Sequence, residues 1–377
     1  MTAPDGRRTL LILSFSPIAS DARVLKQVNL FRDEYAVITC GYGPAPEGVV
    51  EHLRIHDDVA IWRYDRLLVA SRRFSKAYWS NAAIVAAGHL LEGRSFDVVL
   101  ADDVDAVGLA LALPSGGVHA DLHEYAPRQK EDLSRWRLFV APFMRWMCRE
   151  YVTKAASVTT VGQGIADEYR RQFGIDAAVV TNAAPYADRE PTPVHDPIRL
   201  VHSGAALHDR NIMTIVDAVS AATSAVTLDL YLTPNDPAHL DALKARQSDR
   251  ITVHDPVPYH LLSETLSAYD VGVHILPPVN FNNEWALPNK FFDYIQARLG
   301  LIIGPSPEMA RVIREYGVGV VTSDFSTHAL AREIDALTPQ RVAAYKSASA
   351  ASARSLSAEE QVVGWKRAID AIVRRGT

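Results

Sequence analysis

Cysteine is scarce in this chain of 377 residues, because only Cys40 and Cys148 occur. The two do not form a metal-type or redox pair in the sequence, and a disulfide framework would need more of them. We therefore expect a protein of a reducing compartment, with the cytoplasm as its location.

Long apolar runs and a large excess of one charge are also absent. The run "TLLILSF" (9–15) is shorter than the roughly 20 residues that a transmembrane helix needs, and it lacks the form of a signal peptide. Lys and Arg number 39 against 44 Asp and Glu, so the net charge of −5 gives no basic field for a nucleic acid. Nucleic acid is not expected as a partner, and any membrane contact would be peripheral, at the inner face of the membrane.

Glycine-rich phosphate motifs are missing as well. The first predicted strand runs into "SFSPIASDARV" (14–24), which does not contain G-x-G-x-x-G, and the P-loop pattern G-x-x-x-x-G-K-[ST] does not occur. These absences weigh against a dehydrogenase and against a P-loop NTPase.

The sequence instead alternates short apolar strands with amphipathic helices, such as the helix predicted over 21–34. The predicted strands are 10–16, 36–43, 97–103, 117–124, 157–162 and 177–184, followed by 198–204, 226–232, 250–255, 270–276, 301–305 and 318–323. Such alternation predicts parallel sheets that are covered by helices on both faces.

A break separates the two series of strands. Residues 185–197, "PYADREPTPVHDP", contain four prolines and show no periodicity, as expected of a linker. We predict two doubly wound α/β domains, at 1–187 and 198–356, joined by a linker at 188–197. A last helix, 357–377, either packs on its own domain or returns to the first one. Ligands are expected beyond the carboxyl ends of the strands, in a cleft between the domains.

The start of the second domain carries groups that suit a phosphate. Gly204 follows a predicted strand and would let a phosphate approach the backbone. Arg210, at a helix start, adds a guanidinium where the helix dipole already favours an anion. The alternative is a glycine turn followed by a solvated arginine.

The helix predicted within "LPNKFFDYIQARLG" (287–300) places two charged side chains on one face. Pro288 suits its first helical position. Lys290 and Asp293 are three residues apart and therefore neighbours, whereas the phenylalanines and the isoleucine face the core. Lys290 can reach a phosphate and Asp293 a ribose diol, and a surface ion pair is the alternative.

These stretches belong to a longer series that resembles the GT-B glycosyltransferases, particularly glycosyltransferase family four. Residues 284–320, "EWALPNKFFDYIQARLGLIIGPSPEMARVIREYGVGV", resemble the donor-binding signature of that family. The other similar segments are "SPIASDARVLKQVNLF" (16–31), "ADLHEY" (120–125), "VVTNAAP" (179–185), "SGAALHDRN" (203–211) and "AYDVGVHIL" (268–276). The resemblance therefore covers most of the chain in order.

The resemblance implies two Rossmann-like domains facing each other across a cleft, with the acceptor on the N-terminal domain and a nucleotide-diphosphate sugar on the C-terminal one. It implies a retaining, hexosyltransferase-type reaction that needs no metal and no cofactor. The donor would be of UDP or GDP type and the acceptor a glycan, lipid-linked or small molecule, in cell-surface polysaccharide or glycoconjugate biosynthesis. The implied donor-binding residues are Gly204, Arg210, Val257, Glu284, Leu287, Pro288, Asn289, Lys290 and Asp293.

Catalytic roles follow from the same resemblance. Arg210 and Lys290 would stabilise the charge that develops on the leaving diphosphate. His123 matches the histidine at a strand end of the family's first domain and would hydrogen-bond the donor sugar or the leaving phosphate. Glu124, Asp21 and Arg23 are expected on the acceptor side, and a mutual salt bridge is the alternative for Asp21 and Arg23.

Two positions depart from the family pattern. The first acid of its paired-acid motif should stand eight residues before Asp293, where this chain has Trp285, and Glu284 is one place off. An arginine often follows the glycine in the family, and Ala205 occupies that place here. Whether Glu284 replaces the missing carboxylate stays open, and with it the donor sugar.

A pair of acids in "LADDVDA" (100–106) raises the question of a metal site. Asp is a preferred N-cap, so we interpret Asp102 and Asp103 as caps of a helix over 104–112.

Other functions stay open beside the glycosyltransferase. The first alternative is a catalytically weak or inactive glycosyltransferase-like protein that binds a nucleotide or a glycan. The second is another GT-B chemistry, such as sugar-nucleotide epimerisation. Residues 71–79 and 135–154 interleave basic with aromatic residues, which fits either docking on a membrane surface or core helices with solvated basic faces.

Overall fold

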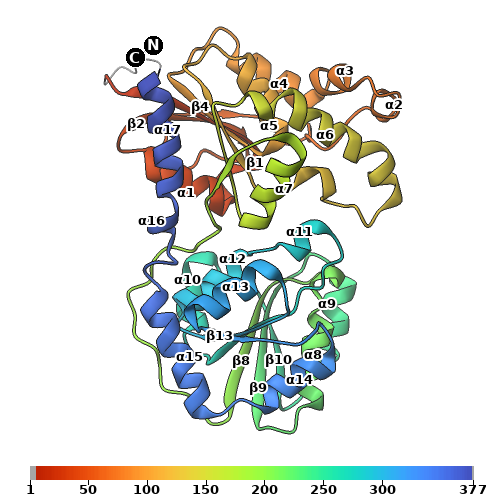
Figure 1. Cartoon of the computed structure of the whole chain (residues 1–377), viewed down its shortest axis with the longest axis vertical. Coiled ribbons are helices and arrows are strands. Elements are labelled where there is room, and N and C mark those ends of the chain that lie inside the picture. The colour runs from red at the N-terminus through yellow and green to blue at the C-terminus, as the bar shows by residue number, and fades with distance from the viewer. Residues whose placement is uncertain (1–5, 376–377) are drawn as a thin grey trace. The chain divides into compact units, whose positions relative to one another are not determined.

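The computed structural model describes residues 6–375 and divides the chain into two compact units (Figure 1). Unit 1 contains the chain up to Thr181, the short segment Asn280–Asn282 and the C-terminal residues from Val362. Unit 2 contains Asn182–Val279 and Asn283–Gln361. Within residues 6–375, no helix combines the length and the apolar character that crossing a membrane requires.

Unit 1 is built on a parallel sheet of seven strands in the order β3-β2-β1-β4-β5-β6-β7. The strands are β1 (Arg8–Pro17), β2 (Tyr35–Tyr42), β3 (Glu51–Arg54), β4 (Val98–Asp102), β5 (Val118–Leu122), β6 (Ser157–Thr160) and β7 (Ala177–Val179). The order reverses between β1 and β4, so the loops after these strands diverge and leave room for ligands at their carboxyl ends.

The helices of unit 1 cover this sheet. They are α1 (Ala22–Phe31), α2 (Arg66–Ala70), α3 (Phe74–Trp79), α4 (Ala82–Leu91), α5 (Asp103–Ala112), α6 (Ala141–Glu150), α7 (Gln163–Phe173) and α17 (Val363–Arg375). Short turns lie at η1 (Ile18–Ser20), η2 (Ala126–Arg128), the π-helical η3 (Trp136–Val140) and η4 (Val152–Lys154).

The C-terminal helix α17 belongs to the core of unit 1. Trp365, Ile369 and Ile372 recur at helical spacing and are buried in one cluster with Leu10 of β1 and Phe31 of α1. Figure 1 shows α17 in dark blue beside the red α1. The first and last parts of the sequence therefore build a single core.

Unit 2 is built on a parallel sheet of six strands in the order β10-β9-β8-β11-β12-β13. Its strands are β8 (Ile198–Ala205), β9 (Val226–Thr233), β10 (Ile251–His254), β11 (Val271–His274), β12 (Gly300–Ile303) and β13 (Gly319–Val321). The remaining helices are η5 (His208–Arg210), α8 (Ile212–Ala221), α9 (Pro237–Lys244), α10 (Tyr259–Leu266), α11 (Phe281–Glu284), α12 (Asn289–Gln296), α13 (Pro307–Tyr316), α14 (Thr327–Asp335), α15 (Pro339–Ser352) and α16 (Ala358–Gln361).

The predicted α/β class with two doubly wound, parallel sheets is confirmed. All twelve predicted strands occur, although several end earlier than predicted; the last strand of unit 1 stops at Val179 because the chain leaves the sheet there. Strand β3 was not predicted, because "EHLR" is a mostly exposed edge strand without an apolar run. Ala183 and Ala184 pack in the core of unit 2, so the units divide after Thr181.

Candidate functional site

In unit 2, the turn after β8 brings a lysine onto the backbone of a glycine. Gly204 has a φ of +141°, and a Cβ at this position would lie 2.5 Å from Nζ of Lys290. Only glycine tolerates both the backbone angle and this close approach. Gly204 and Lys290, each predicted to bind the donor, therefore lie against each other.

Lys290 lies over two buried histidines. Its Nζ is 3.4 Å from Nε2 of His202, whose Nδ1 lies 2.8 Å from the carbonyl oxygen of Val273. The ring of His274 stacks 5.8 Å from that of His202. Burial and then the charge of Lys290 keep the pKa of both histidines well below the usual range, so both rings are neutral.

A second cation acts on the same lysine. Burial, followed by the charge of Arg210, lowers the pKa of Lys290 to about 7, and Asp293 offsets only part of this shift. Arg210 closes η5 two residues before α8, and its nearest ion pair is a 3.8 Å contact with the adjacent Asp209. The charges of Lys290 and Arg210 repel each other, and the neutral histidine rings carry no negative charge to balance them. An anion bound here would balance this positive charge.

Helix α12 carries a further charged residue of the predicted donor site. Asp293, one turn after Lys290, is only 6% exposed, while Phe291, Phe292 and Ile295 fill the core of unit 2 as predicted. Asp293 contributes to a raised pKa of Tyr259, second to burial, so its carboxylate lies near the start of α10.

The other predicted donor residues flank these groups in unit 2. Val257 and Pro258 precede α10, and Leu287 is buried next to α12. Glu284 ends α11 and is partly exposed. Pro288 is not the first helical residue as predicted, because its ψ of 158° is extended; it is the N-cap, and α12 begins at Asn289.

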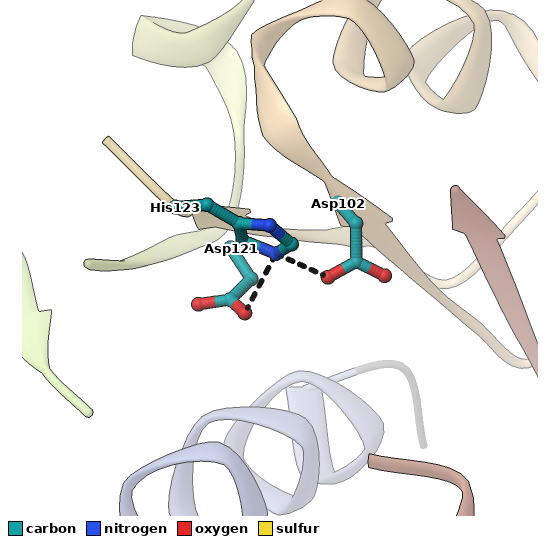
Figure 2. Close-up of side chains that lie close together, drawn as sticks. All are labelled: Asp102, Asp121 and His123. Atoms are coloured by element: carbon teal, nitrogen blue, oxygen red, sulfur yellow. Dashed lines mark hydrogen bonds and ion pairs between the residues drawn. The ribbon is translucent and has the colours of Figure 1, made fainter. Parts of the chain in front are cut away.

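In unit 1, the carboxyl ends of β4 and β5 bring a histidine between acids. Asp102 and Asp121 are partners in the register of these parallel strands, and His123 follows two residues after Asp121. Nε2 of His123 lies 3.2 Å from Asp102 Oδ1 and 3.6 Å from Asp121 Oδ2, as Figure 2 shows. The predicted strand-end position of His123 therefore places it in a buried acidic cluster.

Asp103 holds the other side of this histidine. Its Oδ1 accepts a 2.9 Å hydrogen bond from the backbone N–H of His123, and its Oδ2 lies 3.4 Å from Nδ1 of the ring. Asp103 also has a φ of +63°, a strained conformation for a residue with a Cβ. Strain at this position is held by the surrounding contacts and orients the carboxylate toward His123.

The interpretation of these acids as helix caps is right for the position of Asp102 and wrong for its side chain. Asp102 is the N-cap of α5, but its side chain makes no capping hydrogen bond. Instead its Oδ1 accepts from Nε2 of Gln27 at 2.8 Å and contacts His123, and its buried Oδ2 has no partner. Tertiary contacts across the sheet thus compete successfully with local capping.

The charges of the cluster follow from its contacts. Burial alone would lower the pKa of His123, but Asp103, Asp102 and Asp121 outweigh it and hold that pKa well above its usual range. Burial raises the pKa of Asp102 to about 7, even though His123 counteracts it. Burial also opposes ionisation of Asp121, but Arg23 and His123 keep its pKa well below the usual range. His123 is therefore held as an imidazolium.

Asp102, Asp121 and His123 offer ligand atoms within 4.8 Å of one another, a spacing that a metal ion could span. However, both oxygens of Asp121 already accept from Arg23, at 2.7 Å each. Gln27 and Thr159 add hydrogen bonds to the same carboxylate. A metal ion would have to displace the guanidinium, so these residues fit a protonated histidine better than a metal.

The salt bridge between Asp21 and Arg23, the alternative to an acceptor-side role, does not form. The carboxylate of Asp21 caps α1 by accepting from the backbone N–H groups of Arg23 and Val24. The guanidinium of Arg23 is buried on Asp121, donates to the carbonyl oxygen of Val180 at 3.0 Å and stacks 4.7 Å from the ring of Trp365. The acceptor-side role of both residues stays a prediction, and the burial of Arg23 favours a supporting role.

Glu124 lies next to the cluster. Burial and then the charge of Asp103 raise the pKa of this carboxyl to about 7. Its Oε2 accepts a 3.0 Å hydrogen bond from the amide of Asn282, in the segment that belongs to unit 1, and its Oε1 accepts from Gln129. Glu124 can therefore hold or release a proton near neutral pH.

Several residues of both sites were missed by sequence reasoning. They are Gln27 and Asp121 in unit 1, and His202 and His274 in unit 2, while Asp102 and Asp103 were noticed but interpreted as helix caps. Polar residues at the ends of adjacent parallel strands were the available signal, since strand ends share one edge of the sheet.

Comparisons with known proteins identify the fold. No family model and no curated protein matches the sequence. Among solved structures, trehalose 6-phosphate synthase from Burkholderia multivorans matches with a TM-score of 0.69 at 11% identity, over 98% of this chain and 100% of that one. Anabaena HepE in complex with UDP-glucose matches with a TM-score of 0.67 at 13% identity, over the same shares of the two chains.

A larger protein is similar over part of its length. The S. aureus TarM mutant solved with UDP and an α-GlcNAc-glycerol matches with a TM-score of 0.60 at 11% identity, and 76% of this chain covers 58% of TarM. The chain therefore has the GT-B fold, the two-sheet architecture of nucleotide-sugar glycosyltransferases.

Proposed function

We propose that this protein is a retaining, metal-independent glycosyltransferase of the GT-B fold and a member of glycosyltransferase family four. The observation that carries the proposal is the ammonium group of Lys290 against Gly204, at the carboxyl end of β8, with Arg210 close enough for its charge to act on this lysine. That edge of the sheet is where doubly wound folds bind nucleotides.

Each group has a role in this reaction. The diphosphate of the donor would lie on Lys290 and Arg210, which stabilise the negative charge that develops as the sugar leaves. Asp293 would accept hydrogen bonds from the ribose, and the backbone at Val257 and Pro258 would contact the base. His123, held as a cation, would donate a hydrogen bond to the sugar or the leaving phosphate.

The donor is proposed to be of UDP or GDP type, with no cofactor besides it. The UDP-glucose complex of HepE supports a UDP-sugar. The acceptor is proposed to be a glycan, lipid-linked or small molecule of cell-surface polysaccharide or glycoconjugate biosynthesis, and the compartment the cytoplasm.

A catalytically weak or inactive nucleotide-binding or glycan-binding protein is the second candidate. Trp285 stands where an active family member would carry its first acid, and Ala205 where it would often carry an arginine. A substitution of Glu284, the neighbouring carboxylate, distinguishes the two candidates. If the protein is an enzyme, Glu284→Gln should abolish sugar transfer but leave nucleotide binding intact.

Thermal stabilisation by UDP, GDP, ADP, CMP and dTDP tests the site. A nucleotide at 100 times its dissociation constant should add about 2.7 kcal/mol to the free energy of unfolding. Arg210→Ala and Asp293→Ala should lose that gain, while Arg314→Ala, on exposed α13 surface, should keep it. If no nucleotide stabilises the wild type, the donor site does not exist and the proposal fails.

The nucleotide that stabilises the protein is then supplied as its sugar conjugates. Release of free nucleotide from these conjugates distinguishes an enzyme from a binding protein. Slow donor hydrolysis is expected of a retaining enzyme without acceptor. Binding without any release would favour the second candidate.

A further inference from the structure

One face of unit 1 combines exposed apolar side chains with clustered positive charge. We define the basic apolar face as residues 62–79 and 128–149. These two segments carry eleven Lys and Arg against three Asp and Glu, in a chain whose net charge is −5. All but Arg128 of these basic residues are exposed. The rest of the chain is correspondingly acidic, so the positive charge is local.

Large apolar side chains are exposed on the same two segments. Of the eleven exposed large apolar residues among residues 6–375, six lie in these two segments: Trp62, Leu67, Trp79, Leu133, Leu138 and Phe139. Leu67 is 82% exposed and Leu138 is 66% exposed. Trp62, Leu67, Leu133 and Phe139 line a single groove. Exposed apolar side chains gathered in this way mark a surface that another body covers.

The segment Trp136–Val140 differs from a core helix with a solvated basic face. This π-helical turn, η3, consists of a tryptophan, an arginine, a leucine, a phenylalanine and a valine, yet none of the five is buried. In contrast, the following helix α6 buries Phe143 and Met147 and exposes Arg145 and Arg149. Helix α6 is a core helix, whereas η3 has no core of its own to enter.

A groove lies beside η3, against α2. Its volume is about 660 Å³, and apolar side chains from both segments line it, among them Trp62, Leu67 and Phe139. Arg66, Lys130 and Arg135 are the charged residues of its lining. An apolar groove with a cationic rim fits a hydrocarbon chain joined to an anionic head group.

From this arrangement we propose that the basic apolar face docks on an anionic phospholipid bilayer, with one lipid hydrocarbon chain entering the groove between α2 and η3. Basic residues interleaved with Trp, Phe and Leu are the pattern of interfacial segments. The apolar groove with its cationic rim favours a lipid over an acidic protein, and failure to float with anionic vesicles would point to the protein instead. The proposal goes beyond the glycosyltransferase activity and holds whether or not the chain transfers a sugar.

Vesicle flotation tests the docking. Wild-type protein should float with vesicles of phosphatidylglycerol and phosphatidylcholine, and not with phosphatidylcholine alone. Each basic residue at an anionic surface is worth about fivefold in affinity, so Arg72→Glu with Arg73→Glu should weaken binding at least about 25-fold. The matched control, Lys244→Glu with Arg314→Glu, replaces two exposed basic residues of unit 2. It should keep at least half of the wild-type affinity for the vesicles.

The apolar contribution has its own pair of variants. Leu67→Glu with Leu138→Glu should reduce vesicle binding about tenfold or more, whereas Val50→Glu with Val85→Glu, at apolar positions outside the face that are 52% and 42% exposed, should not. All four positions are exposed, so each variant is expected to fold, which its thermal unfolding checks.

Lipids brominated in the acyl chain test the groove. They should quench tryptophan fluorescence of the wild type, and Trp62→Phe with Trp136→Phe should lose most of that quenching. No flotation with anionic vesicles, or equal loss in the control variants, would overturn the docking. Flotation without quenching would overturn the entry of a chain. Nucleotide stabilisation of the same variants distinguishes failure of this inference from failure of the donor site.

Discussion

At the scale of single residues, the site in unit 2 depends on Lys290, which is only partly protonated near neutral pH. Burial and Arg210 bring the pKa of Lys290 to about 7, and the two neutral histidines beneath it offer no counter-charge. A bound anion would favour the protonated lysine and thus raise its pKa. Protonation and anion binding are therefore linked at this one side chain.

This linkage predicts that nucleoside diphosphate binding weakens as pH rises above about 7. Below that pH the free protein already carries the proton; above it, binding must take one up, so the affinity should fall up to about tenfold per pH unit. Calorimetric titration in buffers of different ionisation enthalpy would measure the proton uptake. Lys290→Met should bind more weakly and show no such pH dependence; if it keeps the wild-type slope, another group titrates.

Gly204 gives a second prediction at this scale. Gly204→Ala should cost about 1–3 kcal/mol of stability through backbone strain, and should also displace Lys290 and abolish nucleotide binding. Gly317→Ala is the matched control, because Gly317 also has a positive φ, of +67°, but has open space around it. Urea unfolding and nucleotide titration of both variants measure this. Equal nucleotide affinity in the two variants would contradict the close approach of Lys290.

At the scale of elements, the ends of parallel strands β4 and β5 assemble a network that no single segment contains. Register places Asp102 beside Asp121, and α1 supplies Arg23 and Gln27 to the same carboxylates. His123 completes the network from the loop after β5. Helix α1 is thus fixed to the sheet by buried polar contacts as well as by its apolar face.

The buried pair Arg23–Asp121 predicts a large cost for breaking it. Asp121→Asn leaves the guanidinium buried without its counter-charge and should destabilise the protein by about 3–5 kcal/mol. Glu51→Gln removes a partner of Arg94 from an exposed bidentate pair and should cost about 0–1 kcal/mol. Chemical denaturation of the two variants makes the comparison, and similar costs would mean that Arg23 finds another partner.

At the scale of the whole molecule, the two ends of the chain share one core. Trp365 and Ile369 of α17 are buried with β1 and α1, although more than 300 residues separate them in sequence. Unit 1 is therefore complete only after the last helix has been made.

Trp365→Ala should consequently destabilise unit 1 by about 3–5 kcal/mol, the usual cost of deleting a buried aromatic side chain. Hydrogen exchange should accelerate in β1 and α1 and stay unchanged in β8 and β11, because the latter belong to the core of unit 2. Trp285→Ala, at a partly exposed tryptophan of unit 2, is the control. Faster exchange throughout both units would show that they unfold together.

The sequence by itself determined the two parallel sheets, the series of strands and the buried face of α12, because apolar periodicity is a local property of the chain. Spacing also singled out Gly204, Arg210 and Lys290 at a strand end and at helix starts, and the resemblance to the glycosyltransferases singled out His123. Only the tertiary structure decided what these residues contact. The pairing of Arg23 with Asp121, the acids around His123, the histidines under Lys290 and the return of α17 to unit 1 all join segments far apart in sequence. Strand register and burial decide such contacts, and neither is encoded in any one segment.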